Sequence, residues 1–118
     1  MKKFVFIFLF FISLFGVSQE RANMHFPDIL GYKTLMCDFH LHTVFSDGLV
    51  YPNYRMKEAW VDGVDVLSIT DHVEYMPHKQ YIDTNRNLSY QIAKPLESRY
   101  GVVLIKGTEI TRSLPFGH

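Results

Sequence analysis

The fold is decided by the stretch Leu35-Met36-Cys37-Asp38-Phe39-His40-Leu41-His42, which the turn Ser46-Asp47-Gly48 follows. Successive side chains of a β-strand point to opposite faces, so this stretch can be sorted by alternation. One predicted face is apolar and consists of Leu35, Cys37, Phe39 and Leu41. The other consists of Asp38, His40 and His42, all of which can bind a proton or a metal ion. The alternation therefore predicts a strand with one buried face and one chemically active face.

Two histidines that are two residues apart on a strand can bring two imidazole nitrogens to a single cation. The turn at Ser46-Asp47-Gly48 adds a carboxylate near the end of the same strand. The alternative is a half-exposed strand with two solvent-facing histidines, because so short a motif also occurs by chance.

Residues 1–18 have the pattern of a secretory signal peptide. Two lysines give a positive start, a mostly apolar run extends from Phe4 to Phe15, and Gly16-Val17-Ser18 supplies small residues. The run is short for a membrane span, although an uncleaved N-terminal anchor is the alternative. We therefore expect a secreted or periplasmic protein that begins at or near Gln19 and is not held to a membrane after leader removal.

The composition is typical of a globular protein, and its charge does not favour nucleic-acid binding. Of the 118 residues, 47% are hydrophobic, and the formal net charge is +0. This balance argues against a nucleic-acid-binding patch that depends on a broad positive field. The single cysteine, Cys37, cannot form an internal disulfide, and its place on the apolar face predicts a buried side chain.

After the turn, the chain is predicted to alternate between helices and buried strands. Pro52 suits the first turn of a helix whose apolar residues recur at helical spacing, and Gly63 is a natural stop for that helix. Residues 64–70 are mostly apolar, as in a strand that is buried on both faces. A polar loop follows over residues 72–85.

A second helix is expected over residues 88–100, where Pro95 should interrupt the regular part. Residues 102–105 then read as the third strand. Before the first strand, residues 19–34 have no clear period and are expected to be an irregular lead-in.

Each of the three predicted strands ends at residues that can bind metal. These are His40, His42 and Asp47 for the first strand, Asp71 and His72 for the second, and Glu109 for the third. Alternating strands and helices indicate a parallel sheet, and the carboxyl ends of parallel strands lie on one side. We therefore expect these residues to converge in space.

The motifs at the strand ends resemble the first three motifs of the PHP (polymerase and histidinol phosphatase) domain family. They are Asp38-Phe39-His40-Leu41-His42-Thr43 with Ser46-Asp47-Gly48, then Ile69-Thr70-Asp71-His72, then Gly107-Thr108-Glu109-Ile110. Members of this family fold as a distorted (β/α)7 barrel, hold up to three divalent metals, and in many cases hydrolyse phosphoesters. The resemblance implies an α/β chain in which residues 35–118 form about three βα units, the N-terminal portion of such a barrel.

The resemblance also implies metal ligands. His40 and His42 would hold a first metal, and Glu109 would bridge it to a second. His118, in the terminal segment Pro115-Phe116-Gly117-His118, would be a ligand of that second metal.

Further roles follow from the same resemblance. Asp47 and His72 would hold a third metal, whereas Asp71 and Asp38 would orient metal-bound histidines. Asp71 is thus a candidate catalytic residue, together with Arg112, which could bind a substrate phosphate. A surface arginine without such a role is the alternative for Arg112.

Imidazole and carboxylate ligands suit zinc, manganese or iron. Such ions activate water near neutral pH and neutralise phosphoryl oxygens, so the expected function is metal-dependent hydrolysis of a small-molecule phosphomonoester or phosphodiester. The alternatives are an amidohydrolase-like metal-dependent hydrolase and a non-catalytic metal-binding or interaction module.

A closed barrel needs about 200 residues or more, roughly twice the mature chain. The later His and the late Asp-x-His of the family pattern do not occur in this sequence. We therefore expect the sequence to be the N-terminal part of a larger enzyme, or a truncated gene product, and the 118-residue chain to be inactive by itself.

Overall fold

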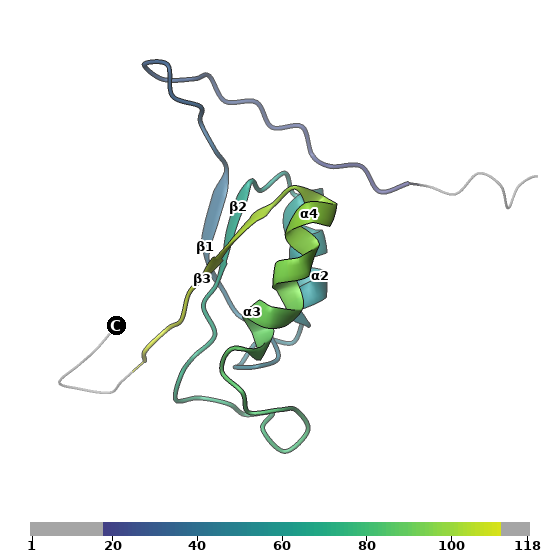
Figure 1. Ribbon diagram of the computed structural model, residues 1–118, viewed down its shortest axis with the longest axis vertical. Helices are drawn as coiled ribbons and strands as arrows, with labels where there is room; N and C mark the ends of the chain where they lie inside the picture. Colours follow the sequence, from purple (N-terminus) through teal and green to yellow (C-terminus); the bar gives the residue numbers. More distant parts are fainter. Residues whose placement is uncertain (1–17, 112–118) are drawn as a thin grey trace, which may run out of the picture.

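A computed structural model describes residues 18–111, which form a parallel sheet with helices packed on one of its faces (Figure 1). The predicted leader, except Ser18, lies outside the described residues, as do Arg112 and His118. In chain order the elements are β1 Cys37–Leu41, α2 Pro52–Val61, β2 Val66–Ile69, α3 Leu88–Ala93, the 3-10 helix Lys94–Leu96, α4 Glu97–Tyr100 and β3 Val103–Lys106. The strands lie in the order β1-β2-β3, and both neighbouring pairs are parallel. Within residues 18–111, no helix has the length and apolar character needed to cross a membrane.

The predicted stops and interruptions of the helices are confirmed. Helix α2 ends at Val61, and Gly63 adopts a left-handed backbone with a φ of 79°, which glycine tolerates. The segment 88–100 is helical but divided, because Pro95 lies in a 3-10 turn between α3 and α4 and has no N–H to donate.

The core lies between β2, β3 and the helices. Strand β2 is buried along its whole length, as its composition predicted. Its residues Leu67 and Ile69 join a cluster of eight buried side chains, the others being Met56, Ala59, Val64, Ala93, Val102 and Leu104. Burial of this apolar surface is the main source of stability available to so small a sheet.

The lead-in is irregular, as predicted, but it is tied to the amino end of the sheet. The Arg21 guanidinium donates to Asp65 Oδ1 at 2.6 Å and to the Gly63 carbonyl oxygen at 3.1 Å. The second oxygen of Asp65 accepts the backbone N–H of Met36 at 2.9 Å, so one carboxylate links the lead-in to the start of β1.

The prediction that the apolar face of the first strand is buried is wrong. Cys37 is exposed, and Phe39 is 57% exposed. Cys37 aligns with Val66 and Val103 across the sheet, whereas the helices pack on the opposite face, which carries Leu67.

A shift in the pairing of β1 with β2 separates Leu41 from the rest of the predicted apolar face. Asp38 aligns with Leu67 and Leu41 with Ile69, so three steps along β1 match only two along β2. The irregularity turns Leu41, but not Phe39, toward the core. Strict alternation along the strand cannot describe a segment that contains such a shift.

Candidate metal centre

Five titratable side chains meet at the carboxyl ends of the three strands. This strand-end cluster consists of His40, His42, Asp47, His72 and Glu109. The structure brings them together because β2 and β3 continue in parallel past their ends, where His72 and Glu109 form an isolated bridge. The convergence expected from a parallel sheet is therefore present, and the roles of these residues as ligands stay predictions.

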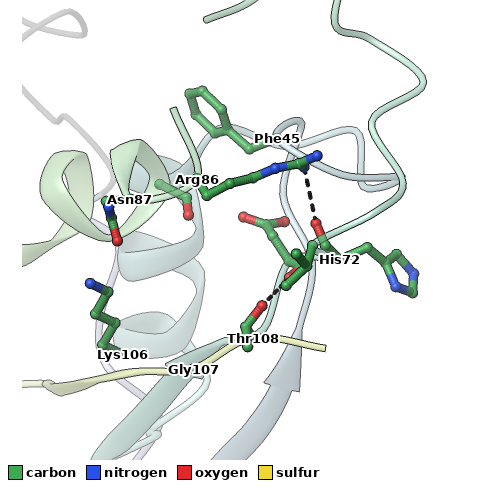
Figure 2. Close-up of a pocket in the computed structure, with 10 residues that line it drawn as sticks. Phe45, His72, Arg86, Asn87, Lys106, Gly107 and Thr108 are labelled. Carbon is green, nitrogen blue, oxygen red and sulfur yellow. Dashed lines mark hydrogen bonds between the residues drawn. The ribbon is translucent and has the colours of Figure 1, made fainter. Parts of the chain in front are cut away.

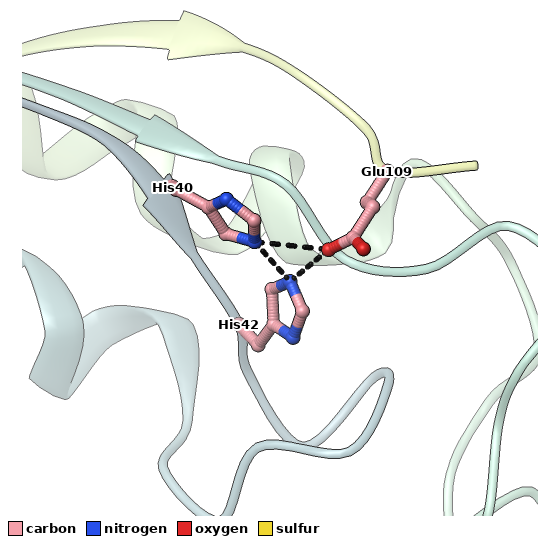
Figure 3. Close-up of side chains that lie close together, drawn as sticks. All are labelled: His40, His42 and Glu109. Atoms are coloured by element: carbon pink, nitrogen blue, oxygen red, sulfur yellow. Dashed lines mark hydrogen bonds and ion pairs between the residues drawn. The ribbon is translucent and has the colours of Figure 1, made fainter. Parts of the chain in front are cut away.

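Three ligand-type atoms of the cluster form a tight triangle (Figure 3). Glu109 Oε2 lies 2.9 Å from His40 Nε2 and 2.7 Å from His42 Nε2, and the two nitrogens are 3.2 Å apart. Ligands about 2.0–2.1 Å from a tetrahedral zinc ion would lie about 3.3 Å from one another. The donor set and the spacing therefore fit a single divalent ion.

A second group shares His42 with the first. Asp47 Oδ1 lies 2.7 Å from His42 Nδ1, and Asp47 Oδ2 lies 3.5 Å from His72 Nε2. The rings of His42 and His72 contact edge to face, with centroids 4.5 Å apart. Asp47 therefore stands between the two imidazoles and can either bind an ion with His72 or orient His42.

The carboxylates of Asp71 and Asp38 accept hydrogen bonds from backbone and hydroxyl groups, and their role in orienting histidine rings stays a prediction. Asp71 accepts from the Thr43 backbone N–H at 2.6 Å, from the Thr43 hydroxyl at 2.7 Å and from the Ser46 hydroxyl at 2.7 Å. It thus holds the turn that presents Asp47. Asp38 accepts the backbone N–H of His40 at 3.1 Å, on the face of β1 that aligns with Leu67.

Glu109 is held in its ionised form. Its pKa is lowered to about 2, and the hydrogen bond from the Thr111 hydroxyl makes the largest contribution. Burial acts in the opposite direction, and the three histidines of the cluster lower the pKa further. For Asp47, burial raises the pKa, but the hydrogen bond and charge of His42 outweigh it, so the net shift is downward. Two anionic carboxylates beside three imidazoles are a suitable environment for a divalent cation.

Thr111 belongs to this site, and sequence reasoning missed it. Its hydroxyl lies 2.7 Å from Glu109 Oε1 and 2.9 Å from His72 Nδ1. The available signal was its place two residues after Glu109, which puts it on the same side of an extended chain. The predicted Arg112 and His118 lie outside the described residues.

Two cavities flank the strand ends. One, of about 340 Å³, lies beside the triangle and is lined by Phe39, His40, Thr70, Thr108, Glu109 and Ile110. The other, also about 340 Å³, lies near the start of α3 and includes the cations Arg86 and Lys106 (Figure 2). Arg86 donates to the carbonyl oxygen of His72 at 3.2 Å, but the His72 ring points away from this cavity. The first cavity is thus lined by the proposed ligands His40 and Glu109, and the second by His72.

Gly107 allows β3 to approach β2 just before Glu109. A Cβ at this position would overlap the Ser68 hydroxyl and lie 2.8 Å from Thr70 Cγ2. We expect Gly107→Ala to reduce the free energy of unfolding by about 1–3 kcal/mol and to weaken metal binding, because Glu109 must shift. Denaturant unfolding and zinc titration would measure the two effects.

Gly101→Ala is the control, since an added Cβ there meets no atom within 4 Å and only the φ of 66° is strained. It should cost about 1–2 kcal/mol and leave metal affinity unchanged. Equal zinc affinity in the Gly107→Ala variant and the wild type would show that Gly107 is not needed to place Glu109.

The sequence is similar to proteins from bacteria and an archaeon, although no family model matches it. It is 32% identical over 78 residues to an uncharacterised protein of Methanocaldococcus jannaschii, a match that covers 66% of this chain and 34% of that protein. The chain thus spans about a third of the length of this relative.

Two solved structures are also similar. A two-domain protein of Bacteroides vulgatus, which contains a predicted PHP-like metal-dependent phosphoesterase, is 48% identical, with a TM-score of 0.81 over 86% of this chain and 29% of that chain. A predicted metal-dependent phosphoesterase of Bifidobacterium adolescentis is 28% identical, with a TM-score of 0.53 over 69% of this chain and 24% of that chain.

Proposed function

Since the chain belongs to the PHP family, we propose that the complete protein is a metal-dependent phosphoesterase. The observation that carries the proposal is the triangle of His40 Nε2, His42 Nε2 and Glu109 Oε2, whose separations suit one divalent ion. The phosphoesterase descriptions of the two similar structures support the same kind of chemistry.

We assign the first ion to the triangle and a second ion to Asp47 Oδ2 and His72 Nε2. His42 serves the first ion only, since its Nδ1 is occupied by Asp47 Oδ1 at 2.7 Å. This division uses each nitrogen of His42 once and gives the ring a carboxylate that fixes its orientation. His118 is proposed as a further ligand, of an ion that Glu109 would bridge.

The ions, whether zinc, manganese or iron, would supply a water of lowered pKa and positive charge for the phosphoryl oxygens. The side chains provide geometry and charge. Asp47 holds the His42 ring, and Glu109 places its anionic oxygen between two imidazoles. The Asp71 carboxylate fixes the Thr43–Ser46 turn from which Asp47 projects. Asp71 is thus proposed as a positioning residue.

We also propose that residues 35–118 are the N-terminal part of a (β/α)7 barrel in an exported protein. The uncovered face of the sheet supports the barrel, because it carries the exposed apolar side chains Phe39, Val103 and Ile105. Additional strands would pair with the edges and enclose this face. Export is proposed on the leader pattern of residues 1–18.

The test is to assay the complete protein on p-nitrophenyl phosphate, bis-p-nitrophenyl phosphate and an aryl amide, with manganese or zinc and then with chelator. We expect chelator-sensitive cleavage of a phosphoester and none of the amide. Cleavage of the amide alone would favour the amidohydrolase-like alternative. A metal-loaded protein without any turnover would favour a binding module.

A further inference from the structure

We propose that Thr111 is a positioning residue that fixes which nitrogen of His72 carries the proton, and thereby aims the other nitrogen at Asp47. The inference rests on the proposed function, since it concerns ligands of the same site. Its geometric basis is one hydroxyl placed between two side chains, 2.7 Å from Glu109 Oε1 and 2.9 Å from His72 Nδ1.

The protons of these groups can be assigned by counting donors. A threonine hydroxyl has one hydrogen to donate and lone pairs that accept, whereas an ionised carboxylate can only accept. An ordinary glutamate is ionised at neutral pH, so the Thr111 hydroxyl donates to Glu109 Oε1. The contact with His72 is then satisfied only if Nδ1–H of the imidazole donates to the Thr111 oxygen.

The consequence falls on the other nitrogen of His72. A neutral imidazole protonated at Nδ1 has its lone pair at Nε2, and that atom lies 3.5 Å from Asp47 Oδ2. His72 is only 8% exposed, so water competes little for either ring nitrogen. Nδ1 lies 2.9 Å from the Thr111 hydroxyl and 3.8 Å from Glu109 Oε1.

Thr111 therefore links the two proposed ion positions. It holds Glu109, a member of the triangle, and His72, a member of the second group, through a single hydroxyl. Partners of this kind behind metal ligands typically change metal affinity by about 10–100-fold when they are removed.

The test compares Thr111→Val, which keeps the shape but loses the hydroxyl, with Thr111→Ser, which keeps the hydroxyl. The complete protein is labelled with ¹⁵N-histidine, freed of metal with chelator and studied at alkaline pH, where an ordinary imidazole is neutral. Two-bond ¹H–¹⁵N spectra identify the tautomer, and a His72→Gln spectrum assigns the signal. Thr34→Val is the matched control, because Thr34 lies in the lead-in outside the cluster and its hydroxyl also donates a hydrogen bond, to the Pro27 carbonyl oxygen.

We expect the Nδ1–H tautomer in the wild type, Thr111→Ser and Thr34→Val, and its loss or a mixture in Thr111→Val. Zinc affinity should fall about 10–100-fold in Thr111→Val alone. The Nε2–H tautomer in the wild type, or an unchanged tautomer and zinc affinity in Thr111→Val, would overturn the inference. The tautomer is read without turnover, so a protein with this pattern but no phosphoesterase activity would refute the proposed function and still support the role of Thr111.

Discussion

The His42→Ala variant of the complete protein is expected to lose nearly all its bound transition metal. His42 affects both proposed ion positions, because Nε2 belongs to the triangle and Nδ1 holds Asp47, a proposed ligand of the second ion. Apparent binding energies of four-ligand zinc sites are about 10–16 kcal/mol, so one ligand is worth on the order of 3 kcal/mol, or about 100-fold in affinity. The fall in metal affinity of the His42→Ala variant should exceed that of losing one ligand, because Asp47 and Glu109 also lose a partner.

Elemental analysis of the purified protein, followed by zinc titration, measures this effect. His40→Ala should also lose metal, but less, since His40 contributes to the triangle only. The matched control is His25→Ala, because His25 is an exposed lead-in residue outside the cluster. Equal metal content in these three variants would show that the cluster is not the metal site.

The sequence was sufficient to predict the elements and their convergence, because both depend on local patterns. Apolar runs predicted the second and third strands, and Pro95 predicted the division of the second helical segment. Parallel pairing then requires the strand ends to meet. This is why His42, His72 and Glu109, far apart in sequence, could be placed at one site.

The errors concern contacts that no local pattern encodes. The register shift after Asp38 depends on how β1 pairs with β2, and it puts Leu41 against the core while Phe39 stays exposed. The Asp71 carboxylate accepts from the backbone and hydroxyls of a turn 25 to 28 residues earlier, contacts that the sequence did not predict. The Arg21 contact with Asp65 spans 44 residues, and periodicity carries no information on such a pair.

Glu109→Gln in the complete protein is expected to remove phosphoesterase activity almost completely. Glu109 Oε2 faces His40 and His42, and Oε1 accepts from Thr111, so the carboxylate is the centre of the cluster. Glutamine has nearly the same shape but no charge, and its NH2 group would face a donor or a ligand nitrogen. Loss of one preorganised electrostatic group commonly costs about 10²–10³-fold in rate, and here weaker metal binding adds to that cost.

We therefore expect kcat/KM to fall by about 10³-fold or more, with bound metal reduced in parallel. The pKa of Glu109 is about 2, below its ordinary value of 4.5, so the carboxylate is ionised throughout the working range. The ratio of wild-type to variant rates should consequently be flat from about pH 5 to about pH 8, since neither side chain titrates there. Glu20→Gln, in the exposed lead-in, is the matched control and should retain wild-type activity. A Glu109→Gln variant with wild-type metal content and turnover would rule out Glu109 as the shared carboxylate of the centre.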